Sequence, residues 1–310
     1  MSPFRLAHLS DLHLSPPPLS ATEMAPKRLL SRWAWRRKRL RHDSAALAAI
    51  REDVRAARPD HIAITGDLTN FSTAAEFAAA RTWLEALAPA ESVTVSPGNH
   101  DALAGAARPE RFAPWIPWLG DAGAAVFPQV RRRGPVAIVN LCSAAPTALH
   151  LAQGVLDEAQ LARLPGLLRE AGEAGLFRVV LIHHPPAPSV VSRRKALRQA
   201  PRLLDVLAEA GAELVLHGHA HAATLSSARG PAADIPVLGV PSASGSGTHG
   251  EAARWHEIAV SRPDGGWAVE VAARGAMAGG TVGELGRYRL SRAGSGSASG
   301  SGSSGRSAAR

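Results

Sequence analysis

The sequence has a single cysteine, Cys142, among its 310 residues. One thiol cannot form an intramolecular disulfide, so a disulfide framework is excluded and a reducing, cytoplasmic location is expected. The lack of thiolates also argues against a closed structural zinc site. Because Cys142 lies in the apolar run 136–142, we expect it to be a buried strand residue.

Long apolar runs and an export signal are also missing. No stretch reaches the roughly 18 apolar residues of a membrane-spanning helix. No N-terminal segment combines a charged start, an apolar centre and a small-residue cleavage site. We therefore expect a protein that is neither exported nor threaded through a bilayer. Aromatic residues make up only 5% of the chain and are not interleaved as in a base-stacking platform, so no nucleic-acid partner is expected.

Basic residues outnumber acidic ones, 35 to 26, which gives a formal charge of +9. They concentrate at residues 27–41 and 131–133, and such a balance favours phosphate-bearing partners. Residues 16–42 form a Pro-rich and then basic insertion. It could form a lid, an interfacial helix resting on anionic membrane lipid, or an ordinary solvated helix. Leu29, Leu30, Trp33 and Leu40 stand among its basic residues.

Five short polar motifs follow one another along the chain, each just after a strand-like apolar run. In open α/β sheets the carboxyl ends of neighbouring strands converge on one crevice, so we expect the motifs to share one site. Residues two apart in extended backbone point to the same face, which would bring the members of each Asp-x-His or His-x-His pair together. The motifs are Asp11-x-His13, Gly66-Asp67, Gly98-Asn99-His100-Asp101, His183-His184 and Gly218-His219-Ala220-His221.

With these motifs the sequence resembles the calcineurin-like metallophosphoesterase superfamily over about residues 4–221. We prefer His183 to His184 as the ligand from its motif, although His184 remains an alternative. Among the histidines outside the five motifs, only His217 is expected to lie next to the site. The others are expected to be surface residues, namely His8, His42, His61, His150, His249 and His256. The resemblance implies one metal ion held by Asp11, His13, Asp67 and His221. It implies a second ion, bridged to the first by Asp67, held by Asp67, Asn99, His183 and His219.

Carboxylate, amide and imidazole ligands suit two divalent ions such as Mn, Fe, Co or Zn. Such a pair can acidify a bridging water and clamp the phosphoryl oxygens for in-line attack. A departing alkoxide needs a proton, and we predict His100 as the general acid, as the resemblance also implies. Asp101 is predicted to orient that imidazole, or alternatively to cap the following segment.

The expected fold class is α/β. Alternating helices and strands, together with the resemblance, predict a four-layer α/β/β/α sandwich with two central mixed sheets. One catalytic domain is expected over residues 1–290. A tail at 291–310, rich in Gly and Ser and without apolar anchors, is expected to be disordered. Asp43 and Asp157 are predicted helix N-caps.

The predicted elements come from apolar periodicity. Helices are predicted at residues 44–58, 74–87, 157–169 and 195–210. Strands are predicted at 4–9, 61–65, 93–96, 136–142, 178–182 and 213–217. Three later strands, predicted to form a second sheet, are at 236–240, 255–260 and 267–271.

The predicted function is metal-dependent hydrolysis of a phosphodiester with a small-molecule phosphoester substrate. The motif 10–13 and His183-His184-Pro185-Pro186 resemble bacterial class III cyclic nucleotide phosphodiesterases, which implies a 3′,5′-cyclic nucleotide. One alternative is a pyrophosphatase acting on a UDP-acylglucosamine lipid, with insertion 16–42 placing it at the membrane surface. A DNA-repair nuclease ranks third. A protein that keeps this fold as a binding module without catalytic activity is disfavoured, because the motifs supply every expected metal ligand.

Overall fold

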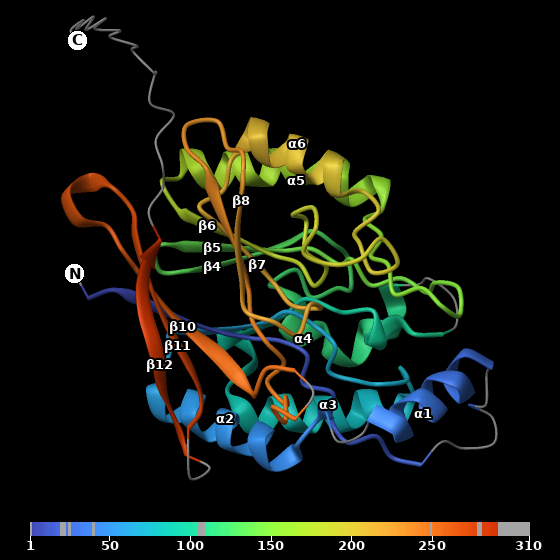
Figure 1. Ribbon diagram of the computed structural model, residues 1–310. Coiled ribbons are helices and arrows are strands. Elements are labelled where there is room, and N and C mark those ends of the chain that lie inside the picture. Colours follow the sequence, from blue (N-terminus) through green and yellow to red (C-terminus); the bar gives the residue numbers. More distant parts are fainter. Residues whose placement is uncertain are drawn as a thin grey trace, which may run out of the picture.

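The computed structural model describes residues 2–18, 23, 26–38, 41–104, 109–248, 250–277 and 281–290. The predicted tail, 291–310, lies outside the described residues. Two six-stranded mixed sheets form the centre of the fold, with helices on both outer sides (Figure 1). The described helices are α1 (Pro26–Lys38), α2 (Ser44–Ala57), α3 (Ala74–Leu87), α4 (Ile116–Leu119), α5 (Glu158–Glu173) and α6 (Ala200–Ala210).

The first sheet has the strand order β12-β11-β10-β1-β2-β3. Its three N-terminal strands run parallel, and β10 pairs antiparallel with β1. This sheet consists of β1 (Phe4–Leu9), β2 (His61–Ile64), β3 (Val93–Val95), β10 (Arg254–Ser261), β11 (Ala268–Ala276) and β12 (Val282–Leu290).

The second sheet has the order β4-β5-β6-β7-β9-β8, with four parallel central strands and an antiparallel strand at each edge. It consists of β4 (Gln129–Arg133), β5 (Val136–Asn140), β6 (Phe177–Leu181), β7 (Leu214–His217), β8 (Thr224–Ala228) and β9 (Ile235–Gly239). The prediction that 236–240 shares a sheet with 255–260 and 267–271 is wrong. β9 lies beside β7, whereas β10 returns antiparallel to β1.

Three buried apolar layers hold the sandwich together. Leu6, Val136 and Ile258 belong to the layer between the two sheets. α2 and α3 cover the outer face of the first sheet, and α5 and α6 that of the second; these helix pairs lie at the bottom and top of Figure 1. Burying apolar faces on both sides of each sheet stabilises this layering. The predicted four-layer architecture is confirmed.

Helix boundaries follow local capping chemistry. The Asp43 side chain accepts from the N–H groups of Ala45 and Ala46, and Asp157 accepts from that of Gln160, so both predicted N-caps are confirmed. α6 begins at Ala200 rather than 195, with Pro201 in its first turn, where the missing N–H costs no hydrogen bond. No helix among the described residues is long and apolar enough to cross a bilayer.

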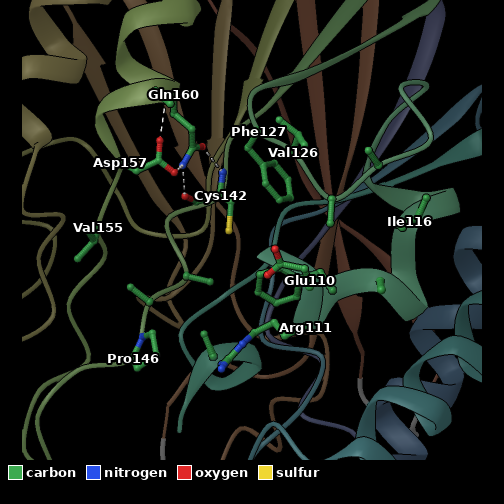
Figure 2. Close-up of a pocket in the computed structure, with 18 of the residues that line it drawn as sticks. Glu110, Arg111, Ile116, Val126, Phe127, Cys142, Pro146, Val155, Asp157 and Gln160 are labelled. Atoms are coloured by element: carbon green, nitrogen blue, oxygen red, sulfur yellow. Dashed lines mark hydrogen bonds between the residues drawn. The ribbon is translucent and has the colours of Figure 1, made fainter. Parts of the chain in front are cut away.

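Cys142 is buried as predicted, but it follows strand β5 instead of lying in it. Its N–H donates to the Gln160 side chain, and its carbonyl oxygen accepts from the same side chain. Figure 2 shows this thiol at the edge of a mainly apolar cavity of about 650 Å³ that Ile116 and Phe127 also line. Burial raises the pKa of the Cys142 thiol to about 12, which keeps it protonated and unreactive.

Candidate metal centre

The polar motifs meet at one crevice where strands of both sheets end. β1, β2 and β3 bring in the first three motifs, and β6 and β7 bring in the other two. Contacts between side chains of the two sheets then close the site. The structure brings together all the predicted ligands, namely Asp11, His13, Asp67, Asn99, His183, His219 and His221.

The first group of donors consists of Asp11, His13 and His221, next to Asp67. His221 Nε2 lies 3.1 Å from Asp11 Oδ1. The Nε2 atoms of His13 and His221 face each other at 3.4 Å, and His13 Nε2 is 4.0 Å from Asp67 Oδ2. Donors bound to one ion at about 2.1 Å lie about 3.0 to 4.2 Å apart. The observed spacing therefore fits one cation.

The second group contains Asp67, Asn99 and His183. His183 Nε2 lies 3.3 Å from Asp67 Oδ2 and 3.2 Å from Asn99 Oδ1. The Nδ1 of His183 is 2.5 Å from the Thr65 carbonyl oxygen, which can only accept, so this nitrogen carries a proton. Nε2 is thereby left to bind an ion, with its ring held in place.

His219 and His184 lie beside His183, and the donor atoms of the three are within 4.8 Å of one another. His219 Nε2 donates to the Lys195 carbonyl oxygen at 3.1 Å, which leaves its Nδ1 for an ion. His184 Nδ1 is instead 2.7 Å from the Ser143 hydroxyl. The contacts with carboxylate and amide oxygens described above favour His183 as the ligand, with His184 behind it.

The backbone of the ligand residues is not extended, so this part of the sequence prediction is wrong. Their side chains converge because the backbone turns sharply at each motif, and hydrogen bonds to neighbouring segments hold these turns in place. The N–H groups of Asp11 and His13 donate to the carbonyl oxygens of Gly66 and Asp67. Left-handed conformations outside glycine cost about 1 to 3 kcal/mol each and are typical of functional sites. The φ angles are 54° for Asp11, 44° for His13, 54° for Asp67, 66° for His219 and 53° for His221.

Two glycines of the motifs are required by close approach. A Cβ at Gly98 would clash with the Asp67 carboxylate, and a Cβ at Gly218 would clash with the Ser10 side chain and the Asp11 carboxylate. Any larger residue would therefore push a ligand carboxylate away from the centre.

Electrostatics also favour a cation here. Burial opposes the ionisation of Asp67, but His183 and His100 outweigh it and lower the pKa of that carboxyl group. Burial likewise opposes a charge on His183, yet the Asp67 carboxylate raises the pKa of this imidazole to about 9. A proton shared between buried acceptors occupies the position that a divalent ion would take. Donor type, spacing and charge all fit two metal ions.

His100 lies beside the centre with its orientation set by the backbone. Its N–H donates to Asp67 Oδ1 at 2.7 Å, and its Nδ1 is 2.8 Å from the Asn70 carbonyl oxygen. Nδ1 is therefore protonated, which leaves Nε2 as the atom for proton transfer. The His100 ring meets the His13 ring edge to face, with centroids 4.9 Å apart.

Asp101 does not orient His100, which corrects one of the predictions. Its carboxylate accepts the N–H groups of Asp67, Thr69 and Gly98, each at 2.9 Å. Asp101 thus joins the second and third motifs into one unit. Burial, followed by the nearby Asp67 charge, raises the pKa of Asp101 to about 7.

His42, predicted to be a surface residue, lies in the site. Its donor atom is within 4.8 Å of those of His13 and His221. The sequence signal was its position directly before Asp43, since a helix that follows β1 must begin near the crevice. His8, His61 and His256 are buried rather than at the surface, while His150 is exposed. His249 lies outside the described residues.

Comparisons with known proteins agree with this geometry. The family model for calcineurin-like phosphoesterases matches residues 4–223. A probable cyclic nucleotide phosphodiesterase of Synechococcus sp. is 26% identical over 245 residues, covering 72% of this chain and 80% of that protein.

Two solved structures share the fold. A dimetal phosphatase from Danio rerio superposes with a TM-score of 0.62 at 12% identity, over 92% of this chain and 99% of that one. A purple acid phosphatase from yellow lupin gives a TM-score of 0.55 at 11% identity, over 93% of this chain and 53% of that one. The chain therefore belongs to the calcineurin-like phosphoesterase family of hydrolases.

Proposed function

We propose that this protein hydrolyses a phosphodiester at a two-metal centre. The observation that carries the proposal is the place of Asp67 between the two donor groups. Its Oδ2 atom lies 4.0 Å from His13 Nε2 and 3.3 Å from His183 Nε2. One carboxylate so placed could bridge two ions, with Asp11, His13 and His221 around the first and Asn99, His183 and His219 around the second.

Two bound divalent ions would supply an acidified water as nucleophile and charge stabilisation for the phosphoryl oxygens. The protein's own side chains would position the substrate for in-line attack and would donate a proton to the leaving group. The Asn70 carbonyl oxygen fixes the His100 ring, so that a proton on Nε2 can pass to the departing alkoxide.

A 3′,5′-cyclic nucleotide is the substrate we propose. A pocket of about 600 Å³ beside the centre has the size of a small-molecule site. Trp35 lines it with a partly exposed aromatic side chain suited to a base, and Arg41 and Lys195 add positive charge for a phosphate. The name of the Synechococcus relative supports the same substrate class.

Removing bound metal should abolish hydrolysis of bis(p-nitrophenyl) phosphate, and adding Mn²⁺ should restore it. The expected loss is at least on the order of a hundredfold, because even one preorganised electrostatic group contributes that much. The measurement is the rate before chelation, after it and after metal addition, followed by a panel with cyclic AMP and glycerophosphodiesters. Undiminished hydrolysis in the metal-free protein would contradict the proposal.

A second candidate is a lipid-linked phosphoester hydrolysed at an anionic membrane surface, and α1 favours it. Lys27 and Arg28 tie this helix to the protein body through the carbonyl oxygens of Thr147, Phe71 and Ser72. The helix exposes its large apolar side chains beside the pocket, where Trp35 and Ser31 of the same helix line the wall. The exposed fractions are 45% for Leu29, 47% for Leu30 and 53% for Trp33.

Replacing Leu29, Leu30 and Trp33 together by serine tests this candidate. Binding to vesicles of phosphatidylglycerol and phosphatidylcholine should weaken at least about tenfold, since burying one such side chain contributes about 1.5 to 3 kcal/mol. Flotation measures the bound fraction. Leu149→Ser is the matched control, because Leu149 is 54% exposed but lies outside α1. Equal flotation of the wild type and the triple variant would count against a membrane role.

A further inference from the structure

His42 is held at the metal centre by backbone pairing, although it comes from the insertion and from none of the five motifs. It forms an antiparallel bridge with Gly245. The flanking N–H of Asp43 donates to the Ser244 carbonyl oxygen at 2.7 Å, and the Arg41 carbonyl oxygen accepts from Ser246 at 2.9 Å. The position of this imidazole is therefore fixed by the fold and not by a flexible loop.

The hydroxyl groups around His42 determine its tautomer. Ser242 donates its only hydroxyl proton to the Asp11 carbonyl oxygen at 2.6 Å. Ser244 Oγ has two acceptors for its own proton, Ser242 Oγ at 3.1 Å and the Asp11 carbonyl oxygen at 3.4 Å. With its proton directed to either of them, Ser244 Oγ accepts from His42 Nδ1 at 2.8 Å. In this arrangement Nδ1 is the protonated nitrogen, and Nε2 carries a lone pair.

The ring of His42 belongs to a cluster of imidazoles. The ring of His42 lies 4.3 Å from that of His13 and 5.8 Å from that of His221, measured between centroids. Donor atoms of the three lie within 4.8 Å of one another. Two nitrogens on one ion can be at most about 4.2 Å apart, so a sub-ångström movement would complete the set.

We propose that His42 Nε2 is a further ligand of the ion held by Asp11, His13 and His221. This inference rests on the two-metal centre of the proposed function. It gives the end of the insertion 16–42 a role in metal binding, besides its contribution to the pocket wall. A third imidazole makes this position richer in nitrogen than its neighbour, which favours Zn or Fe over Mn there.

The test is metal titration of the metal-free protein, followed by calorimetry and by the visible spectrum of bound Co²⁺. The wild type should bind two ions. His42→Ala should bind one of them at least about tenfold more weakly, since even partners outside the ligand shell contribute 10- to 100-fold. The Co²⁺ spectrum should change with the number of nitrogen ligands. Added imidazole should restore both readouts in His42→Ala, which a purely structural role would not allow.

Two further variants serve as controls. His42→Phe keeps an aromatic ring without a donor and should match His42→Ala, whereas His150→Ala, at an exposed histidine outside the site, should bind metal like the wild type. If the wild type binds two ions and His42→Ala has the same affinities and spectrum, only the inference fails. A wild type that binds no ion would overturn both the inference and the proposed function.

Discussion

Asp67→Ala should lose phosphodiester hydrolysis and bound metal together. Asp67 Oδ2 faces both donor groups, and the other carboxylate oxygen of Asp67 accepts the backbone N–H of His100. Removing it should separate the two proposed metal sites and release the backbone of His100, the proposed general acid. Partners outside the ligand shell contribute 10- to 100-fold, so the loss of a bridge should exceed about a hundredfold.

Metal content by mass spectrometry and the rate on bis(p-nitrophenyl) phosphate are the two measurements for Asp67→Ala. Asp205→Ala is the matched control, since Asp205 is an exposed carboxylate on α6. Circular dichroism reports whether the Asp67 variant is folded. A folded Asp67→Ala protein that keeps two ions and its activity would refute the bridging role.

His100→Ala should behave differently, keeping both ions while losing the ability to expel a poor leaving group. General acid catalysis contributes about 10²- to 10⁴-fold, so hydrolysis of alkyl phosphodiesters should slow by that factor. Esters of p-nitrophenol should be much less affected, because this leaving group needs no proton. The hydrogen bond from His100 Nδ1 to the Asn70 carbonyl oxygen fixes the ring orientation and leaves Nε2 available for proton transfer.

The measurement for His100→Ala is the dependence of rate on the leaving-group pKa across a series of diesters. The slope should become steeper in the variant than in the wild type. His150→Ala, at an exposed histidine, is the control. A variant with an unchanged slope would remove His100 from the general-acid role.

Strands buried on both faces were predictable, whereas three of the four edge strands, β4, β8 and β12, were not. β5 and β6 are mostly apolar and buried, whereas β12 is mostly exposed and the large apolar residue of β8, Leu225, faces solvent. Edge strands keep one side in water and therefore carry little apolar signal. The basic cluster 131–133 lies on the edge strand β4, and the prediction that it favours a phosphate-bearing partner does not apply to Arg131. Arg131 is buried in β4, where its guanidinium donates to four backbone carbonyl oxygens instead of facing a phosphate.

The sequence by itself determined the type and order of the candidate ligands, the strands they follow and the helices between them. These properties are local, because apolar periodicity and capping residues act over a few positions. They were sufficient to predict the layered fold, whereas the candidate donor set came from the five motifs and the family resemblance they carry.

Only the tertiary structure decided how each candidate donor is held and which further side chains lie beside the donors. Three features of the site depend on contacts between segments that are distant in the sequence. They are the left-handed backbone at Asp11 and His13, the hydrogen bonds of Asp101 to two motifs, and the position of His42 beside the centre. Such contacts are set when the two sheets pack and the loops between them are paired. No spacing along the chain encodes them, because the pairing partners are up to about two hundred residues apart.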